Sequence, residues 1–148
     1  MIYTVILNSN LRTSGTVSNA MYNFDWGIME NGEYILTWGF CSGNVAATTG
    51  DTIILSADLG QRNVFLCNPL ITRASSTLII GTLIQNENTT SSFFYGDKNT
   101  NGPILLQKPQ SNQFNVKLQT VGATPIDWVD SASQPMGNYI LNLSFLKV

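Results

Sequence analysis

Residues 97–102 (DKNTNG) have the side chains and spacing of the first half of a calcium-binding loop. In such loops oxygen ligands alternate along the chain, and a glycine at the sixth position permits the sharp turn around the ion. The twelfth position, which normally supplies a bidentate glutamate, is Lys108 here. Asn-Gly followed by proline is also an ordinary turn between strands. The turn is therefore the favoured interpretation, and Asp97, Asn99 and Asn101 are only weak candidates for a calcium site.

Aromatic side chains offer a second chemistry, the stacking of sugar rings. Trp26, Trp38 and Trp128, with the aromatic run at 93–95, could supply such platforms. Trp38 lies on the apolar face of an alternating segment, so we expect it in the core. Trp128 follows Asp127 in a loop, and an exposed aromatic there could equally anchor a subunit interface. We favour an interface over a carbohydrate ligand for Trp128 and Asp127, and leave both open.

The sequence contains no set of residues for a familiar reaction centre. It has no histidine, which excludes Ser-His-Asp and Cys-His catalysis and zinc sites that contain histidine. Two cysteines cannot form a four-thiolate zinc site, and no GxGxxG, GxxxxGK or GxSxG motif is present. Nine acidic residues leave a carboxylate pair for glycoside hydrolysis as a formal alternative. We predict no enzyme activity, no catalytic residues and no cofactor.

The two cysteines, Cys41 and Cys67, both occur in strand-like segments. Buried free thiols are the favoured interpretation, because unpaired cysteine behaves as a small hydrophobic residue. A disulfide between them stays open, since a sequence does not give the distance between their Cα atoms.

The composition suits a subunit that is covered by neighbours, and a carbohydrate-binding domain can have a similar one. Charged residues make up 11% of the chain and hydrophobic residues 43%, whereas about a quarter of a typical soluble domain is charged. Neutral polar residues replace the charges: 16 Asn, 15 Thr and 13 Ser. Surfaces with few charges cost less to desolvate when they pack together. The net charge of −2, without adjacent basic residues, argues against direct contact with nucleic acid.

The apolar segments are too short to cross a bilayer, which takes roughly 20 residues. The opening residues lack a basic region followed by an apolar one, so we expect no signal peptide and no membrane span.

Short alternating segments separated by Gly, Pro, Asn and Ser clusters predict strands throughout the chain. The predicted strands span residues 2–8, 20–26, 33–41, 52–59, 62–67, 77–85, 91–95, 103–107, 112–119 and 137–147. Gly39, inside one of them, suggests a bulge or a close approach of backbone. With no composition shift along the sequence, residues 1–148 are expected to form one domain.

Eight to ten antiparallel strands without helical periodicity predict an all-β sandwich. An immunoglobulin pattern is disfavoured, because Trp38 precedes both cysteines instead of lying between them. The last predicted strand is long enough to lie beside the first. The fold expected is therefore a single jelly roll.

Three segments resemble small viral jelly-roll proteins: residues 3–9 (YTVILNS), 32–38 (GEYILTW) and 137–145 (GNYILNLSF), with 112–118 (NQFNVKL) similar in character. The family is the single jelly-roll minor capsid or vertex (penton-like) proteins of large icosahedral double-stranded DNA viruses and virophages. The similarity covers about half of the chain and consists of strand patterns instead of chemical signatures.

The resemblance implies a virion structural protein, assembled in the host cytoplasm, that acts by homo-oligomerisation (a pentamer or a trimer) and by contacts with other capsid proteins. The alternative is a lectin-like or receptor-binding jelly roll, such as a trimeric head with a carbohydrate or protein ligand.

Overall fold

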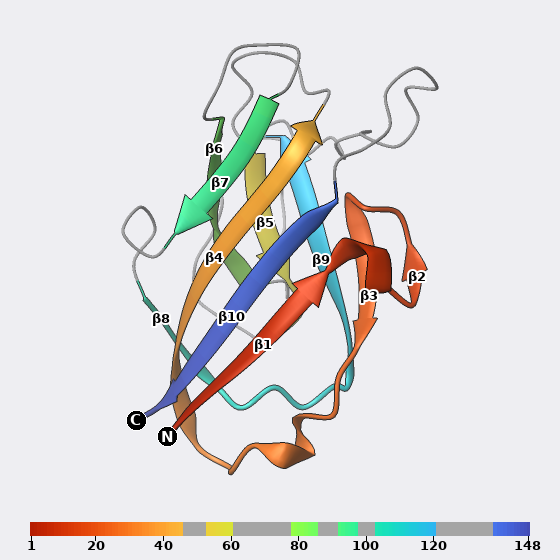
Figure 1. Cartoon of the computed structure of the whole chain (residues 1–148). Helices are drawn as coiled ribbons and strands as arrows, with labels where there is room; N and C mark the ends of the chain where they lie inside the picture. Colours follow the sequence, from red (N-terminus) through yellow and green to blue (C-terminus); the bar gives the residue numbers. More distant parts are fainter. Residues whose placement is uncertain (46–52, 61–77, 86–91, 98–102, 121–137) are drawn as a thin grey trace, which may run out of the picture.

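The protein is built almost entirely of antiparallel strands, as the computed structural model shows (Figure 1). The structure describes residues 1–45, 53–60, 78–85, 92–97, 103–120 and 138–148. Within these ranges there is no α-helix, only the two 3₁₀ turns η1 (Ser9–Leu11) and η2 (Trp26–Ile28). The strands are β1 (Ile2–Asn8), β2 (Ser14–Gly15), β3 (Asn19–Asn23), β4 (Glu33–Val45), β5 (Ile53–Ala57), β6 (Leu78–Gln85), β7 (Ser92–Asp97), β8 (Ile104–Gln107), β9 (Gln113–Thr120) and β10 (Tyr139–Lys147).

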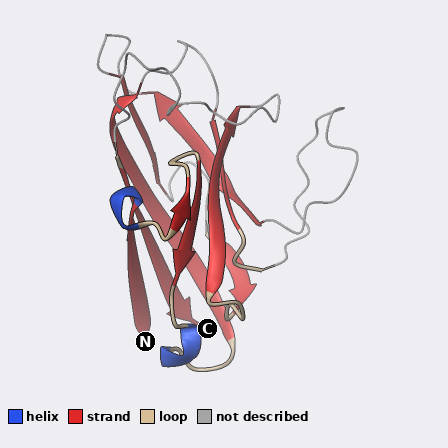
Figure 2. Cartoon of the chain, turned by 90° about the vertical axis from the view of Figure 1, so that its right-hand side faces the viewer, coloured by secondary structure: helices blue, strands red, loops and turns tan. Residues whose placement is uncertain are grey.

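The strands form two layers that face each other (Figures 1 and 2). One layer has the order β1-β10-β4-β7, with β8 beside the first half of β4, and the other has the order β6-β5-β9-β3-β2. Strand β6 links them, because Leu78–Leu83 pairs with β5 while Ile84 and Gln85 pair with β7. Every pairing is antiparallel. The predicted all-β sandwich is thus confirmed.

Most strand boundaries agree with the prediction, and three regions differ. Strand β4 continues to Val45, four residues beyond its predicted end. Strand β3 ends at Asn23 instead of continuing to Trp26, because the carboxylate of Asp25 accepts a hydrogen bond from the Gly27 amide at 2.8 Å and starts η2. The expected loop at 10–18 contains the short strand β2, which pairs with β3. The strand predicted at 62–67 lies outside the described residues.

The core lies between the layers and is made of alternate residues along each strand. In β10, for example, Tyr139, Leu141, Leu143 and Phe145 are fully buried while the residues between them face outward. Burying one large apolar side chain contributes about 1.5–3 kcal/mol. A shift of one residue would turn this whole set toward water, so the hydrophobic pattern fixes the register of β10 between β1 and β4.

Trp26 lies in this core, at one end of the sandwich. Its indole packs against the rings of Phe24, Phe114 and Phe145, with centroid distances of 4.7, 5.4 and 5.4 Å. Only 1% of the residue is exposed. The interpretation of Trp26 as a platform for sugars is therefore wrong, whereas the placement of Trp38 in the core is confirmed.

Gly39 does not form the bulge that its position suggested. It pairs regularly with Asn142 on one side and Asp97 on the other, and the register shift in β4 comes later, between Ser42 and Val45. A Cβ atom built at Gly39 would have no heavy atom within 4 Å, so no close backbone approach requires glycine there either.

Gly15, in contrast, occupies a position where only glycine fits. Its φ is +83°, and a Cβ atom there would lie 2.2 Å from the carbonyl oxygen of Asn19. We expect Gly15→Ala to lower the free energy of unfolding by about 1–3 kcal/mol, the usual cost of a strained backbone position. Urea denaturation followed by circular dichroism measures this change.

Gly39→Ala provides the matched control for that experiment. Because the new methyl group meets nothing and glycine weakens a strand interior, we expect unchanged or slightly higher stability. Equal losses for the two variants would contradict the steric explanation at Gly15.

Candidate interaction surface

The side of the first layer that faces away from the core is the most distinctive surface of the described chain. We call the outward residues of β1, β10 and β4 that lie between the level of Ile2 and the level of Asn8, with Leu105 of β8, the outer face; Glu33 and Gln107 lie just beyond its first row. Their registers align them in four rows across the strands. The rows are Ile2-Leu146-Ile35-Leu105, Thr4-Ser144-Thr37, Ile6-Asn142-Gly39 and Asn8-Ile140-Cys41.

Large apolar side chains on this face are open to solvent. Ile2 and Ile6 of β1 are 65% and 67% exposed, and Leu105 of β8 is 55% exposed. In β10, Ile140 and Leu146 are 46% and 42% exposed. Single exposed apolar residues are normal on protein surfaces, but a contiguous group of them marks an interaction site.

The second row consists of hydroxyl side chains. Thr4 and Ser144 lie opposite each other, and their hydroxyl oxygens are 3.3 Å apart. Thr37 of β4 continues the row on the other side of Ser144. A hydroxyl can donate or accept a hydrogen bond. This row can therefore form hydrogen bonds with donors and with acceptors of a partner.

Charged groups lie only at the border of the outer face in the described residues. Glu33 is at one end of β4, where its carboxylate accepts a hydrogen bond from the Gln107 amide at 3.0 Å. The ammonium group of Lys147 donates to Glu30 at the same end of the sandwich, and this hydrogen bond lowers the pKa of Glu30. Asp97, the last residue of β7, stands opposite Gly39 at the far end of the third row. The interior of the face is neutral.

Cys41 belongs to the outer face and not to the core. It is exposed and pairs with Ile140 in register. The preceding residue, Phe40, points inward instead, because the alternation of β4 places even-numbered residues from Tyr34 to Phe40 in the core. The predicted burial of this thiol is wrong. Cys67 lies outside the described residues, and Cys41 has no disulfide partner within them.

The other residues that the sequence singled out are mostly not brought together. Asp97 ends β7, whereas Asn99 and Asn101 lie outside the described residues, so the calcium site stays a prediction. Trp128 and Asp127 lie outside them as well. Among the side chains that the structure describes, no group of three or more His, Cys, Asp or Glu could hold a metal ion.

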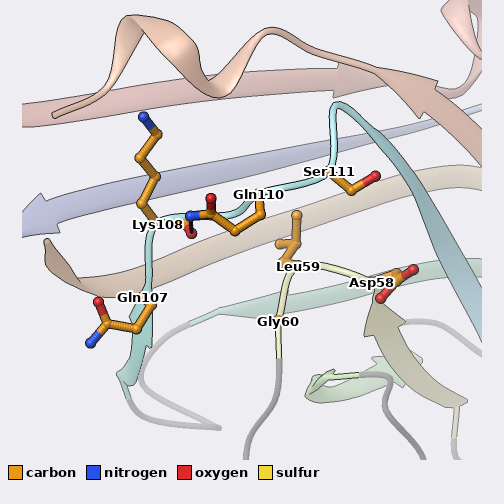
Figure 3. A pocket seen from close by; sticks show the side chains of 7 residues that line it. All are labelled: Asp58, Leu59, Gly60, Gln107, Lys108, Gln110 and Ser111. Carbon is orange, nitrogen blue, oxygen red and sulfur yellow. Dashed lines mark hydrogen bonds between the residues drawn. The ribbon is translucent and has the colours of Figure 1, made fainter. Parts of the chain in front are cut away.

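A shallow depression of about 360 Å³ lies between the segment after β5 and the β8–β9 connection (Figure 3). Its lining is Asp58, Leu59, Gly60, Gln107, Lys108, Gln110 and Ser111. Most polar groups there already have partners within the chain. The Ser111 hydroxyl donates to the Gln113 carbonyl at 2.7 Å, and the Gln110 amide donates to the Lys108 carbonyl at 2.8 Å.

The charges of this depression do not converge. The ammonium group of Lys108 points away from it (Figure 3) and donates to the Asn31 side chain at 3.3 Å. Asp58 is left as a single exposed carboxylate, and one solvated acid does not make a catalytic pair. The depression is therefore a weaker candidate site than the outer face.

No protein-family model and no curated protein matches this chain. In the part of the chain that the structure describes, no helix is long and apolar enough to cross a membrane. What the chain does must therefore be argued from its fold and its surface.

The sequence indicates the outer face through the residue types on one side of two strands, although these residues form no chemical motif. The residues at 2, 4, 6 and 8, and again at 140, 142, 144 and 146, alternate with core residues and include no charge. A solvated strand face normally carries charged or strongly polar side chains. Two neutral outward faces on neighbouring strands indicate a surface that a binding partner covers.

Proposed function

We propose that this chain is a viral structural protein, a single jelly-roll subunit of minor capsid or penton-like type, which acts by self-assembly and by contacts with other coat proteins. Three lines of support come from the strand pairing, from the position of the segments that resemble the family, and from the outer face.

The strand pairing supports a jelly roll because the pairs are nested. Strand β1 pairs with β10, β3 with β9, β4 with β7, and β5 with β6. The pairs thus run from the two ends of the chain to its middle, as in one long hairpin wound into two layers. Jelly rolls have eight strands in two sheets; here β2 and β8 would be additions to the eight.

Three of the four segments that resemble the viral family lie together in space. Residues 3–8, 33–38 and 139–145 fall in β1, β4 and β10, which are neighbours in the order β1-β10-β4, whereas the fourth segment falls in β9 of the other layer. The first three segments supply three of the four strands of the outer face. The resemblance and the candidate interaction surface therefore concern the same part of the fold.

The observation that carries the proposal is the neutral, apolar outer face. A subunit of a shell works through surfaces that other subunits cover, and permanent interfaces are more apolar than the rest of the surface. A catalytic or ligand-binding domain would instead need a pocket with convergent polar groups, and the depression near Asp58 does not have them.

The assembly role predicts a particle-bound protein. Antibodies raised against the recombinant protein are expected to label intact or opened virus particles purified from infected host cells. Multi-angle light scattering of the recombinant protein should give the mass of an oligomer, that is, a whole-number multiple greater than one of the 16.2 kDa chain mass. A protein that stays monomeric and is absent from particles would contradict the proposal.

Carbohydrate binding is the rival prediction, and a substitution at Trp128 distinguishes it from assembly. A glycan array probed with the wild-type protein and with Trp128→Ala would reveal a lectin. Binding that is lost in the variant favours the lectin-like module, whereas absence of binding in the wild type leaves assembly as the explanation for the exposed apolar surface.

A further inference from the structure

We propose that two copies of this chain pack against each other through their outer faces, sheet against sheet. This pairing is a specific form of the proposed assembly role and rests on it. It follows from the geometry of the outer face, and the partner of this face is a second copy of the chain.

The size of the face is sufficient for such a contact. Strands lie about 4.8 Å apart and rise about 3.3 Å per residue, so three strands of about eight residues and the four residues of β8 make a face of roughly 440 Å². Two opposed faces then remove on the order of 900 Å² from water, which is the size of a weak, transient interface. The five most exposed apolar residues of the face, Ile2, Ile6, Leu105, Ile140 and Leu146, lie within this area.

The neutrality of the face suits contact with itself. In a two-fold dimer the same patch supplies both sides, so any charge in the patch meets its own copy or a close neighbour. Like charges brought together in this way are unfavourable. The rows of the outer face within β1, β10, β4 and β8 contain no charged side chain, and Glu33 stands beyond the first row. The patch therefore avoids self-repulsion.

The rows also match themselves chemically. The apolar row from Ile2 to Leu105 offers only hydrocarbon, which packs equally well on a copy of itself. The hydroxyls of Thr4, Thr37 and Ser144 act as donors or acceptors, so hydroxyl groups of two copies can pair. A different protein would be selected in part by charges, and the four rows of this face contain no charged side chain.

Lysine substitution on the outer face tests the pairing. Ile6 and Leu146 are exposed in the single chain, so Ile6→Lys and Leu146→Lys should fold normally, which circular dichroism checks. Sedimentation equilibrium over a range of concentrations gives the dimer dissociation constant. We expect each face variant to raise this constant at least 100-fold, because a buried ammonium group would face apolar side chains.

The matched control is lysine at an equally exposed apolar position away from the face. Ile28 of η2 is 61% exposed and Leu11 of η1 is 78% exposed. Ile28→Lys and Leu11→Lys should leave the dissociation constant within about threefold of wild type, as expected for surface substitutions that touch no interface.

Cys41 gives an independent readout, because it lies in the fourth row of the face. In a Cys67→Ser background it is the only thiol. Its rate of alkylation by iodoacetamide should fall at least tenfold as the protein concentration is raised from below to above the dissociation constant. The Ile6→Lys variant should keep the fast rate at every concentration.

The outcomes separate this proposal from the assembly role. Oligomers that persist in both face variants would overturn the sheet-to-sheet pairing, while leaving assembly through another surface in place. A wild-type protein that is monomeric at millimolar concentration would also overturn the pairing, and labelling of particles would then decide the assembly role alone. Dissociation confined to the face variants, with protection of Cys41, supports the pairing.

Discussion

Replacing Trp26 by alanine is expected to lower the free energy of unfolding by about 3–5 kcal/mol, the range measured when buried aromatic residues are cut back to a methyl group. The residue is 1% exposed and among the largest fully buried side chains of the described structure. The substitution removes the indole and leaves a cavity that rigid neighbours fill only in part.

The position of Trp26 explains why the loss should fall at the upper end. Its ring contacts Phe114 of β9 in one layer and Phe145 of β10 in the other, each at 5.4 Å between centroids. The indole N–H also donates to the Ser111 carbonyl at 3.0 Å, in the connection that enters β9. One side chain thus holds the two layers together at the end of the sandwich where β3 leads into β4.

Urea denaturation followed by far-ultraviolet circular dichroism measures the effect without relying on tryptophan fluorescence. Ile28→Ala is the control, since Ile28 lies two residues further on and is 61% exposed. We expect that control to change the stability by less than about 0.5 kcal/mol. A loss below about 1.5 kcal/mol for Trp26→Ala would mean that the aromatic cluster does not bridge the layers.

The strands could be predicted because the sequence pattern that marks each strand lies within that strand and the turns beside it. Period-two alternation, with turn residues between segments, placed β1, β9 and β10 within one or two residues of their bounds. The burial of Trp38 in β4 was predicted in the same way. Burial of one strand face is a local property that the sequence expresses directly.

Long-range pairing and orientation at strand ends could not be predicted by the same reasoning. Alternation assigns residues to two faces, but it does not say which strands lie side by side. Cys41 was expected to be buried because free cysteine is usually buried, yet the alternation that places Phe40 in the core puts Cys41 on the outward face. Its neighbour in space, Ile140, is almost one hundred positions away along the chain.

Trp26 was misplaced for a related reason. It seemed to end a strand, and a tryptophan at a strand end could be a surface platform. The 3₁₀ turn that starts at Asp25 instead turns the chain inward across the open end of the sandwich. That burial depends on rings from β9 and β10, which are distant in sequence. The neutral outward residues of β1 and β10 can be read from the sequence, but the sequence does not say that these strands lie side by side with β4 and β8.

The stability of this protein should fall steeply in alkaline solution because burial raises the pKa of three described tyrosines, Tyr22, Tyr34 and Tyr139. Tyr22 of β3 and Tyr139 of β10 lie in opposite layers, and the hydroxyl of Tyr22 donates to the hydroxyl of Tyr139 at 2.8 Å. Burial raises the pKa of Tyr139 far above 10, and the nearby Tyr22 raises it further. Burial also raises the pKa of Tyr22, partly offset by the hydrogen bond with Tyr139.

The sign of the pH dependence follows from these shifts. Below pH 10 these phenols are neutral in the folded and the unfolded chain, so they cause no change in stability with pH. Above pH 10 the unfolded chain loses these protons more readily than the folded chain, and the Tyr139 phenol, whose pKa is raised most, lowers the free energy of unfolding by about 1.4 kcal/mol per pH unit. Stability is therefore retained up to about pH 10 and lost above it.

Urea denaturation at intervals from pH 8 to pH 12, with circular dichroism as the probe, measures that slope. Tyr139→Phe should make the decline above pH 10 shallower by about 1.4 kcal/mol per pH unit. The same variant should lose about 1 kcal/mol at pH 8, where the hydrogen bond with Tyr22 is missing. Equal slopes for wild type and Tyr139→Phe would mean that the Tyr139 phenol ionises in the folded chain, so the two layers would not exclude water around this pair.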